Sequence, residues 1–222
     1  EEIDMFFDGG NESFFENDGD FEYVDIDELT VDEKVRSNAV EEEKILKSLV
    51  SDGRVEIEFE AFENEIDRIA LEPVLGFDTE TRPSFKKGKV YPTSLIQISS
   101  LEQSWIIRVS RIGYPKRLLK LLSGELPLKI GVGLQDDIRR LRADFQFEPQ
   151  GFLDLQHYVQ AFRIDEKGLK KITGIVLDKR ISKSQQVSNW DADELSEAQL
   201  RYAATDAWIC LMIYNSLRAS IQ

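Results

Sequence analysis

The chain has 222 residues, of which 41% are hydrophobic and 32% are charged, and its formal net charge is -14. A chain of this size and composition can bury a full core, so it is not a mini-protein that depends on disulfides. Its one cysteine, Cys210, cannot form an internal disulfide, and the first residues lack the pattern of a secretion signal. No stretch approaches the roughly 18 consecutive apolar residues of a membrane span. We therefore expect an intracellular protein outside the membrane, in the cytoplasm of a bacterium or in the nucleus of a eukaryote.

The negative charge is concentrated in the first third of the chain. Residues 1–70 carry 24 acidic and 6 basic side chains, a net charge of -18, whereas residues 71–222 carry 18 acidic and 22 basic side chains, a net charge of +4. Phosphate backbones repel acidic surfaces, so the total charge alone argues against a nucleic-acid enzyme. Because the second part is basic, that objection does not apply to it.

Residues 1–44 are predicted to form an acidic leader. Runs of Asp and Glu with interspersed glycines and aromatic residues are typical of a solvated, weakly ordered segment or of a tail that docks on a protein partner. Residues 45–222 are predicted to form the folded domain.

The first elements of this domain precede a proline. Apolar residues at helical spacing predict a short helix over 41–50. Residues 54–59 alternate apolar and charged side chains, which is the period of a half-buried strand. Residues 62–71 then fit an amphipathic helix that ends before Pro73.

Strands and helices follow in an order that indicates an α/β fold. Val74, Leu75, Gly76 and Phe77 form a short apolar run like a central strand. The later predicted elements are strands over 94–99 and 105–109, a helix over 116–123, a strand over 128–132, a helix over 135–142 and a last helix from Ser196 to about Ala219. Ser196 and Gln199 form the capping-box pattern that starts this last helix. A meander followed by alternating strands and helices predicts a mixed sheet of five or six strands flanked by helices.

Two carboxylates follow the predicted central strand. Asp78 and Glu80 are two residues apart, so both side chains project from the same face. Neighbouring carboxylates repel one another unless a cation lies between them. Taken alone, the pair fits a solvated turn as well as it fits a metal site.

Two helices supply further candidates. Tyr202 and Asp206 are four residues apart on the last helix and face the same way, among alanines. Asp206 could pair with an arginine, and Asp137 could simply be a helix N-terminal charge. Taken together, oxygen ligands without a histidine or cysteine cluster favour Mg²⁺ or Mn²⁺. Two such ions about 3.5 to 4 Å apart activate water for phosphoryl displacement.

Three segments resemble known nuclease motifs. They are Gly-Phe-Asp-Thr-Glu at 76–80, Gly-Val-Gly-Leu-Gln-Asp-Asp at 131–137 and Tyr-Ala-Ala-Thr-Asp-Ala at 202–207. This set resembles the DEDDy branch of the DnaQ-like 3'-5' exonucleases, in particular the Werner-syndrome-type domain, which is related to ribonuclease D. The resemblance covers about residues 54–220 and implies a ribonuclease-H-like fold that hydrolyses nucleic acid, preferably DNA, from a 3' end to nucleoside 5'-monophosphates.

The resemblance also implies a role for each site residue. Asp78, Glu80 and Asp206 would bind the first of two ions, and Asp78 would bridge to the second, which Asp137 would reach partly through water. The motif count from Gly131 selects Asp137 rather than its neighbour Asp136. Tyr202 stands at the position that defines the tyrosine branch and would aim the attacking water. The only histidine, His157, is predicted to be an ordinary surface or core residue.

The substrate contacts are predicted from a basic loop after the first motif. Its members are Arg82, Phe85, Lys86, Lys87 and Lys89, which could clamp a strand end by charge and stacking or could form a merely solvated loop. Thr79 and Trp190 complete the candidate contacts. A second basic stretch, with phosphate contact as the preferred interpretation, comprises Lys170, Lys171, Lys179, Arg180 and Lys183.

Two alternatives remain at this point. A ribonuclease-D-like enzyme that trims RNA has the same five active-site residue types. A catalytically silent scaffold that binds nucleic acid could retain the fold without the activity.

Overall fold

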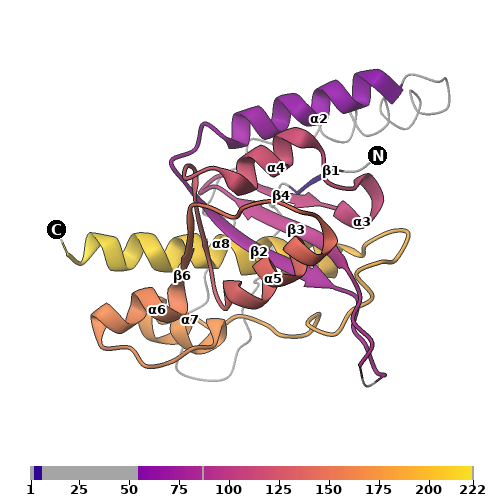
Figure 1. Cartoon of the computed structure of the whole chain (residues 1–222). Helices are drawn as coiled ribbons and strands as arrows, with labels where there is room; N and C mark the ends of the chain where they lie inside the picture. The colour runs from indigo at the N-terminus through magenta and orange to yellow at the C-terminus, as the bar shows by residue number, and fades with distance from the viewer. Residues whose placement is uncertain (1–2, 7–54, 87, 222) are drawn as a thin grey trace.

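Figure 1 shows the computed structural model of the chain, which describes residues 3–6, 55–86 and 88–221. The predicted helix over 41–50, most of the predicted acidic leader and Lys87 lie outside the described residues. In the part of the chain that the structure describes, no helix combines the length and the apolar character that crossing a membrane requires.

The centre of the fold is a six-stranded sheet in the order β1-β4-β3-β2-β5-β6. Its strands are β1 (Ile3–Phe6), β2 (Val74–Thr81), β3 (Thr93–Ser99), β4 (Ser104–Ile107), β5 (Leu128–Gly131) and β6 (Phe152–Asp154). The pairs β1·β4, β4·β3 and β3·β2 are antiparallel, whereas β2·β5 and β5·β6 are parallel. The predicted α/β fold with a mixed sheet is therefore confirmed, and β1, from the segment predicted as the leader, forms one edge of the sheet.

Helices cover both faces of this sheet (Figure 1). On one face lie α2 (Val55–Ile69), α3 (Val109–Ile112), α4 (Lys116–Ser123) and α5 (Leu134–Asp144). On the other face lies α8 (Glu197–Ala219), with α6 (Leu155–Tyr158), the 3-10 helix η2 (Val159–Phe162) and α7 (Leu169–Leu177) packed around its C-terminal half. The exposed His157 lies in α6, which agrees with its interpretation as an ordinary surface residue.

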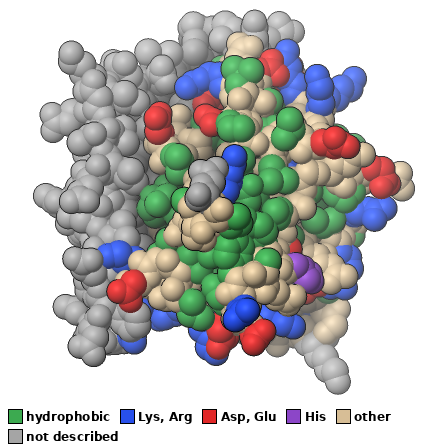
Figure 2. Space-filling model, turned by 90° about the vertical axis from the view of Figure 1, so that its left-hand side faces the viewer, with side chains coloured by type: hydrophobic (Ala, Val, Ile, Leu, Met, Phe, Trp, Pro, Cys, Tyr) green, Lys and Arg blue, Asp and Glu red, His purple; other side chains and the backbone are tan. Residues whose placement is uncertain are grey.

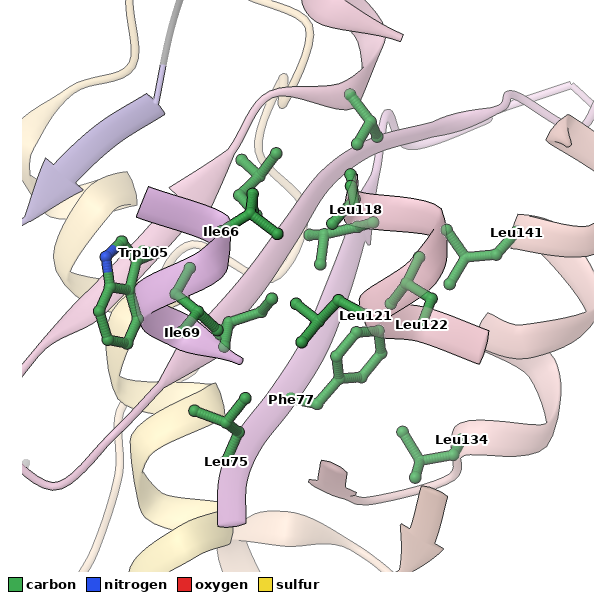
Figure 3. Close-up of a cluster of buried hydrophobic side chains, with 14 residues drawn as sticks. Ile66, Ile69, Leu75, Phe77, Trp105, Leu118, Leu121, Leu122, Leu134 and Leu141 are labelled. Atoms are coloured by element: carbon green, nitrogen blue, oxygen red, sulfur yellow. The ribbon is translucent and has the colours of Figure 1, made fainter. Parts of the chain in front are cut away.

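One part of the core lies between the sheet and the helices α2 to α5. It explains which side chains of β2 point to each face of the sheet. Leu75 and Phe77 are fully buried there, against side chains from α2 and α4 such as Ile69 and Leu121 (Figure 3). Because successive side chains of a strand point to opposite faces, the residues between them face α8 instead.

The strand predicted over 54–59 is wrong, because residues 55–59 form the beginning of α2. An alternation of six residues is short, and glutamate has a high helix propensity, so the local pattern is ambiguous. The residues that follow favour a helix over a strand, because Phe62, Ile66 and Ile69 recur at helical spacing and pack against the sheet. The predicted helix over 62–71 is the second part of the same element, and β6 was not predicted.

The end of the sheet where β2 begins carries apolar side chains at the surface. Figure 2, viewed from the left-hand side of Figure 1, shows hydrophobic side chains gathered between charged ones. Leu71 and Leu126, which precede β2 and β5, are both exposed. Asp78 and Glu80 lie towards the other end of β2, so this surface is not part of the carboxylate group.

α8 lies directly on β2. Its N-terminus has the predicted capping box, in which Gln199 N donates to Ser196 Oγ (3.3 Å) and Ser196 N donates to Gln199 Oε1 (3.0 Å). Further along, the backbone of Ala207 comes so close to Gly76 that a Cβ atom built on Gly76 would lie 1.9 Å from the Ala207 carbonyl oxygen. Only glycine fits this contact.

We expect Gly76→Ala to lower the free energy of unfolding by about 3 kcal/mol, because overpacking against a rigid backbone carbonyl forces α8 away from the sheet. Denaturant unfolding followed by circular dichroism measures this change. Gly174→Ala in α7 is the matched control, since the nearest atom to its added Cβ is 3.7 Å away and alanine favours a helix. Equal stabilities for the two variants would contradict the close-contact interpretation.

Candidate metal centre

Three carboxylates meet where α8 crosses β2. Gly76 faces α8, so Asp78 and Glu80, two and four residues later, face it as well. Asp206 precedes Ala207, the residue in contact with Gly76. Asp78, Glu80 and Asp206 each offer an oxygen, and these oxygens lie within 4.8 Å of one another. The structure thus brings together three of the four predicted acidic ligands.

Burial and mutual repulsion disfavour three negative charges in this group. Asp206 is 8% exposed. Burial and the nearby Asp206 and Asp137 charges raise the pKa of Glu80 to about 9. Burial raises the pKa of Asp206 to about 7, and burial together with the neighbouring carboxylates raises that of Asp78 well above its usual value. Hard oxygen donors in this arrangement fit a divalent cation, which would remove the repulsion.

Asp137 lies beside this group rather than within it. It is in the first turn of α5, and its Oδ1 accepts a hydrogen bond from Thr79 Oγ1 at 2.7 Å and lies 3.8 Å from Arg140 Nη1. Burial raises its pKa, whereas the Thr79 hydrogen bond and the Arg140 charge lower it. Asp136 is exposed and pairs with Arg139 at 2.5 Å, which agrees with the motif count that selected Asp137.

A neighbouring aspartate orients the start of α5. Gly133 precedes this helix in the left-handed conformation, with φ 73°. The Asp154 carboxylate accepts hydrogen bonds from Gly133 N (3.1 Å) and Leu134 N (3.0 Å). Two otherwise unpaired backbone donors at the helix entrance are thereby satisfied, and the position of Asp137 follows from this anchor.

Tyr202 lies one turn before Asp206 on α8, close enough for its phenol to lower the pKa of the Asp206 carboxylate. Burial is the largest cause that raises the pKa of Tyr202, and the charges of Asp206, Glu80 and Asp78 add to it. The phenol is therefore kept neutral, with a proton to donate. The position is consistent with a group that aims a water molecule at the carboxylate site.

Two predicted substrate contacts have other surroundings than expected. Trp190 is 0% exposed, and its ring centroid lies 6.0 Å from that of Tyr202. The indole therefore packs in the core and supports Tyr202, so in this structure it offers no surface to a substrate. Thr79 is buried and donates its hydroxyl to Asp137, so it positions an acidic side chain rather than offering a free polar group.

The basic loop lies between β2 and β3 and extends away from the body of the domain (Figure 1). Arg82, Lys86 and Lys89 are exposed, and Phe85 is 86% exposed. Arg82 Cζ and Lys89 Nζ lie 5.2 Å and 4.5 Å from the centroid of the Tyr91 ring. Tyr91 is therefore covered by cations, whereas the ring of Phe85 is open to solvent.

Two cations act on the carboxylates directly. The charge of Arg140 lowers the pKa values of Glu80 and Asp137, and that of Lys183 lowers the pKa of Asp206. Arg140 was missed in the sequence, although its position three residues after Asp137 on a helix was a usable signal. Lys183 belongs to the second basic stretch, of which Lys171 is paired with Glu166 at 3.0 Å.

Comparison with known sequences identifies relatives of the whole described domain. The sequence model of the 3'-5' exonuclease family matches residues 55–222. Mouse exonuclease 3'-5' domain-containing protein 2 is 33% identical over 189 residues, which cover 79% of this chain and 29% of that protein. The mouse bifunctional 3'-5' exonuclease/ATP-dependent helicase WRN is 32% identical over 156 residues, covering 68% of this chain and 11% of that protein. The chain thus spans less than a third of either relative.

Solved structures share the fold. The Nibbler EXO domain of Aedes aegypti superposes with a TM-score of 0.64 at 24% identity, covering 73% of this chain and 85% of that one. Brucella melitensis NrnC with bound Mg²⁺ superposes with a TM-score of 0.56 at 28% identity, covering 68% and 74% of the two chains. These likenesses support the ribonuclease-H-like arrangement expected from the motifs.

We expect the metal-free protein to lose stability as the pH rises from about 4 to about 9. The folded protein holds protons on Asp206 up to a pKa of about 7 and on Glu80 up to about 9, above their ordinary values of 3.8 and 4.5. It therefore binds more protons than the unfolded chain in this range, so the free energy of unfolding falls with pH. Calorimetric melting in EDTA across the range measures this slope, and a melting temperature that rises over the same range would contradict it.

Asp78→Asn is the matched variant for this measurement. At pH 8 in EDTA it should melt at a higher temperature than the original protein, because asparagine replaces a carboxyl group whose raised pKa opposes the ionisation that the unfolded chain favours at this pH. It should also lose the stabilisation by Mn²⁺, which at 100 times the dissociation constant is about 2.7 kcal/mol, or roughly 5 to 10 °C. Asp136→Asn, next to the site but exposed, should change neither quantity. An unchanged Mn²⁺ response in Asp78→Asn would exclude Asp78 as a ligand.

Proposed function

Because the chain belongs to the 3'-5' exonuclease family, we propose that it removes nucleotides one at a time from a nucleic-acid 3' end by hydrolysing phosphodiester bonds, and that it releases nucleoside 5'-monophosphates. The observation that carries the proposal is the convergence of Asp78, Glu80 and Asp206, whose oxygens lie within 4.8 Å of one another, with Tyr202 one turn before Asp206 on the same helix. A scaffold without activity would have no need for three mutually repelling carboxylates, of which Asp206 is buried and Asp78 and Glu80 are half-buried.

The donor set fits two Mg²⁺ or Mn²⁺ ions. Asp78, Glu80 and Asp206 would hold the first, Asp78 would bridge to the second, and Asp137 would reach the second partly through water. Such a pair of ions, when bound, activates the attacking water and neutralises the charge on the leaving oxygen. The Mg²⁺ bound in the NrnC structure supports magnesium as the ion to test first.

The remaining site residues orient the reactants. Tyr202 keeps its proton, so its hydroxyl can hold the attacking water in line with the scissile phosphate while Trp190 fixes its ring. Arg140 and Lys183 place positive charge beside the carboxylates, where the phosphate of the terminal nucleotide would lie. Thr79 sets the direction of Asp137.

The basic loop is our candidate for the contact with the rest of the strand. Arg82, Lys86, Lys87 and Lys89 would contact phosphates, and the exposed ring of Phe85 would stack on a base. DNA is the proposed substrate because the motifs resemble the Werner-syndrome-type domain. The alternative is RNA, because the same five residue types occur in ribonuclease D.

We expect the purified protein with Mg²⁺ or Mn²⁺ to shorten 5'-labelled single strands of matched sequence, DNA faster than RNA. Asp78→Ala should reduce the rate to background, and Tyr202→Phe should lower kcat by roughly 10²-fold through misplacement of the water while leaving the Mn²⁺ stabilisation intact. Asp136→Asn should keep full activity. Product chromatography distinguishes 5'-monophosphates from other products. No cleavage of either polymer with either ion would favour the silent scaffold, and faster cleavage of RNA would favour the alternative substrate.

For the basic loop, we expect Lys86→Ala and Lys89→Ala to raise KM with little change in kcat. Each lost phosphate contact should reduce the slope of log affinity against log salt concentration by about 0.7 for a single strand. Fluorescence anisotropy with labelled DNA at several salt concentrations, in Ca²⁺ to prevent cleavage, measures that slope. Lys116→Ala, an exposed lysine on α4 at the face of the sheet opposite α8, is the control. Slopes equal to that of the original protein would identify the loop as merely solvated.

A further inference from the structure

We propose that Gln97 is a positioning residue for the metal centre and that its side-chain amide donates a hydrogen bond to the Asp78 carboxylate when a divalent cation is bound. This inference rests on the proposed function, because it assumes that the carboxylates hold a cation. It concerns a residue outside the three motifs and outside the group of acidic side chains.

The sheet register places Gln97 beside Asp78. In the antiparallel pair of β2 and β3, Asp78 is directly opposite Gln97. The Cβ atoms of residues directly opposite one another are about 4.5 to 5.5 Å apart, and their side chains leave the sheet on the same face. A glutamine side chain is long enough to reach a carboxylate across that distance.

The neighbours of Gln97 along β3 show which face this is. Ser99 Oγ lies 3.5 Å from the carbonyl oxygen of Ala204 in α8, and Leu95 packs in one cluster with Ala203 and Ala204. Because side chains alternate along a strand, Gln97, midway between Leu95 and Ser99, also faces α8. Asp78 also faces α8, because it follows Gly76 by two residues on β2 and Gly76 contacts Ala207 of α8.

The amide of Gln97 lacks the partners that a buried polar group normally has. The side chain is 0% exposed, and among the described residues neither its Nε2 nor its Oε1 has a hydrogen-bond partner. Ser99, also buried on this face of β3, is paired, with its Oγ 2.7 Å from Ser104 Oγ. Most buried polar side chains are hydrogen-bonded. An unpartnered amide next to the carboxylate group therefore indicates a hydrogen bond that forms when this group holds a cation.

The chemistry of a carboxylate ligand supplies that bond. An ionised carboxylate has about four lone-pair positions, and a bridging ligand uses only part of them. A donor from outside the metal's own ligands fixes the orientation of such a carboxylate and strengthens its binding. The Nε2 group of Gln97 provides a neutral donor without adding a charge to the buried group. Asp78, the proposed bridging ligand, is the side chain whose orientation matters to both ions.

Gln97→Leu tests the role with a side chain of similar size that cannot form hydrogen bonds. In EDTA the variant should melt at the same temperature as the original protein or above it, since an unpartnered buried amide is removed. The Mn²⁺ concentration at half-maximal thermal stabilisation should rise about 10- to 100-fold. The kcat at limiting Mn²⁺ should fall accordingly and recover at high Mn²⁺, while KM for DNA stays unchanged. Ile96→Val, on the other face of the same strand, should lower the melting temperature without changing the Mn²⁺ requirement.

A measurement on the unaltered protein keeps the inference testable if Gln97→Leu does not fold. The side-chain amide protons of Gln97, followed by nuclear magnetic resonance, should shift and exchange more slowly with solvent when Mg²⁺ is added. An unchanged Gln97 amide signal, or an unchanged Mn²⁺ requirement in Gln97→Leu, would overturn the inference while leaving the proposed function in place. If the unaltered protein shows no stabilisation by Mn²⁺ and no cleavage, the proposed function fails, and this inference fails with it.

Discussion

The backbone contact between α8 and β2 at Gly76 and Ala207 is the constraint on which the rest of the site depends. A helix normally packs on a sheet through intervening side chains, but here a strand glycine lets a helix carbonyl approach the strand directly. Asp206, one residue before this contact, is thereby brought within reach of Asp78 and Glu80. The separation of helix and strand therefore sets the separation of the three carboxylates.

This constraint has an electrostatic cost. The same packing that brings the carboxylates together also buries them, and both effects raise their pKa values. The surrounding core, with α8 between the sheet and α7, supplies the stability that offsets this repulsion. A group of carboxylates held together in this way is preorganised for a cation, because its oxygens already lie close to one another.

The sequence predicted the features that depend on local order. The spacing of Asp78 and Glu80 sets a common face, and the capping box at Ser196 starts α8, so both follow from periodicity and hydrogen bonding over a few residues. Features that depend on distant segments were missed or wrong. The beginning of α2 was predicted as a strand because its tertiary contacts are not visible locally. The burial of Trp190 beneath Tyr202 and α8 was missed for the same reason, because it depends on residues that are distant in the sequence.

The acidic side chains of the site come from three elements, and each element is anchored near its acidic side chain. β2 is central in the sheet, the entrance of α5 is fixed by Asp154, and the segment before α8 is fixed by two arginines. Arg108 donates to the carbonyl oxygens of Ala192 and Asp193, and Arg111 Nη2 donates to Asp193 Oδ1 at 2.7 Å. These anchors lie outside the recognisable motifs, yet they fix the geometry that the motifs require. Motif residues alone therefore specify the chemistry of the site, whereas its precision depends on ordinary polar contacts at the ends of helices.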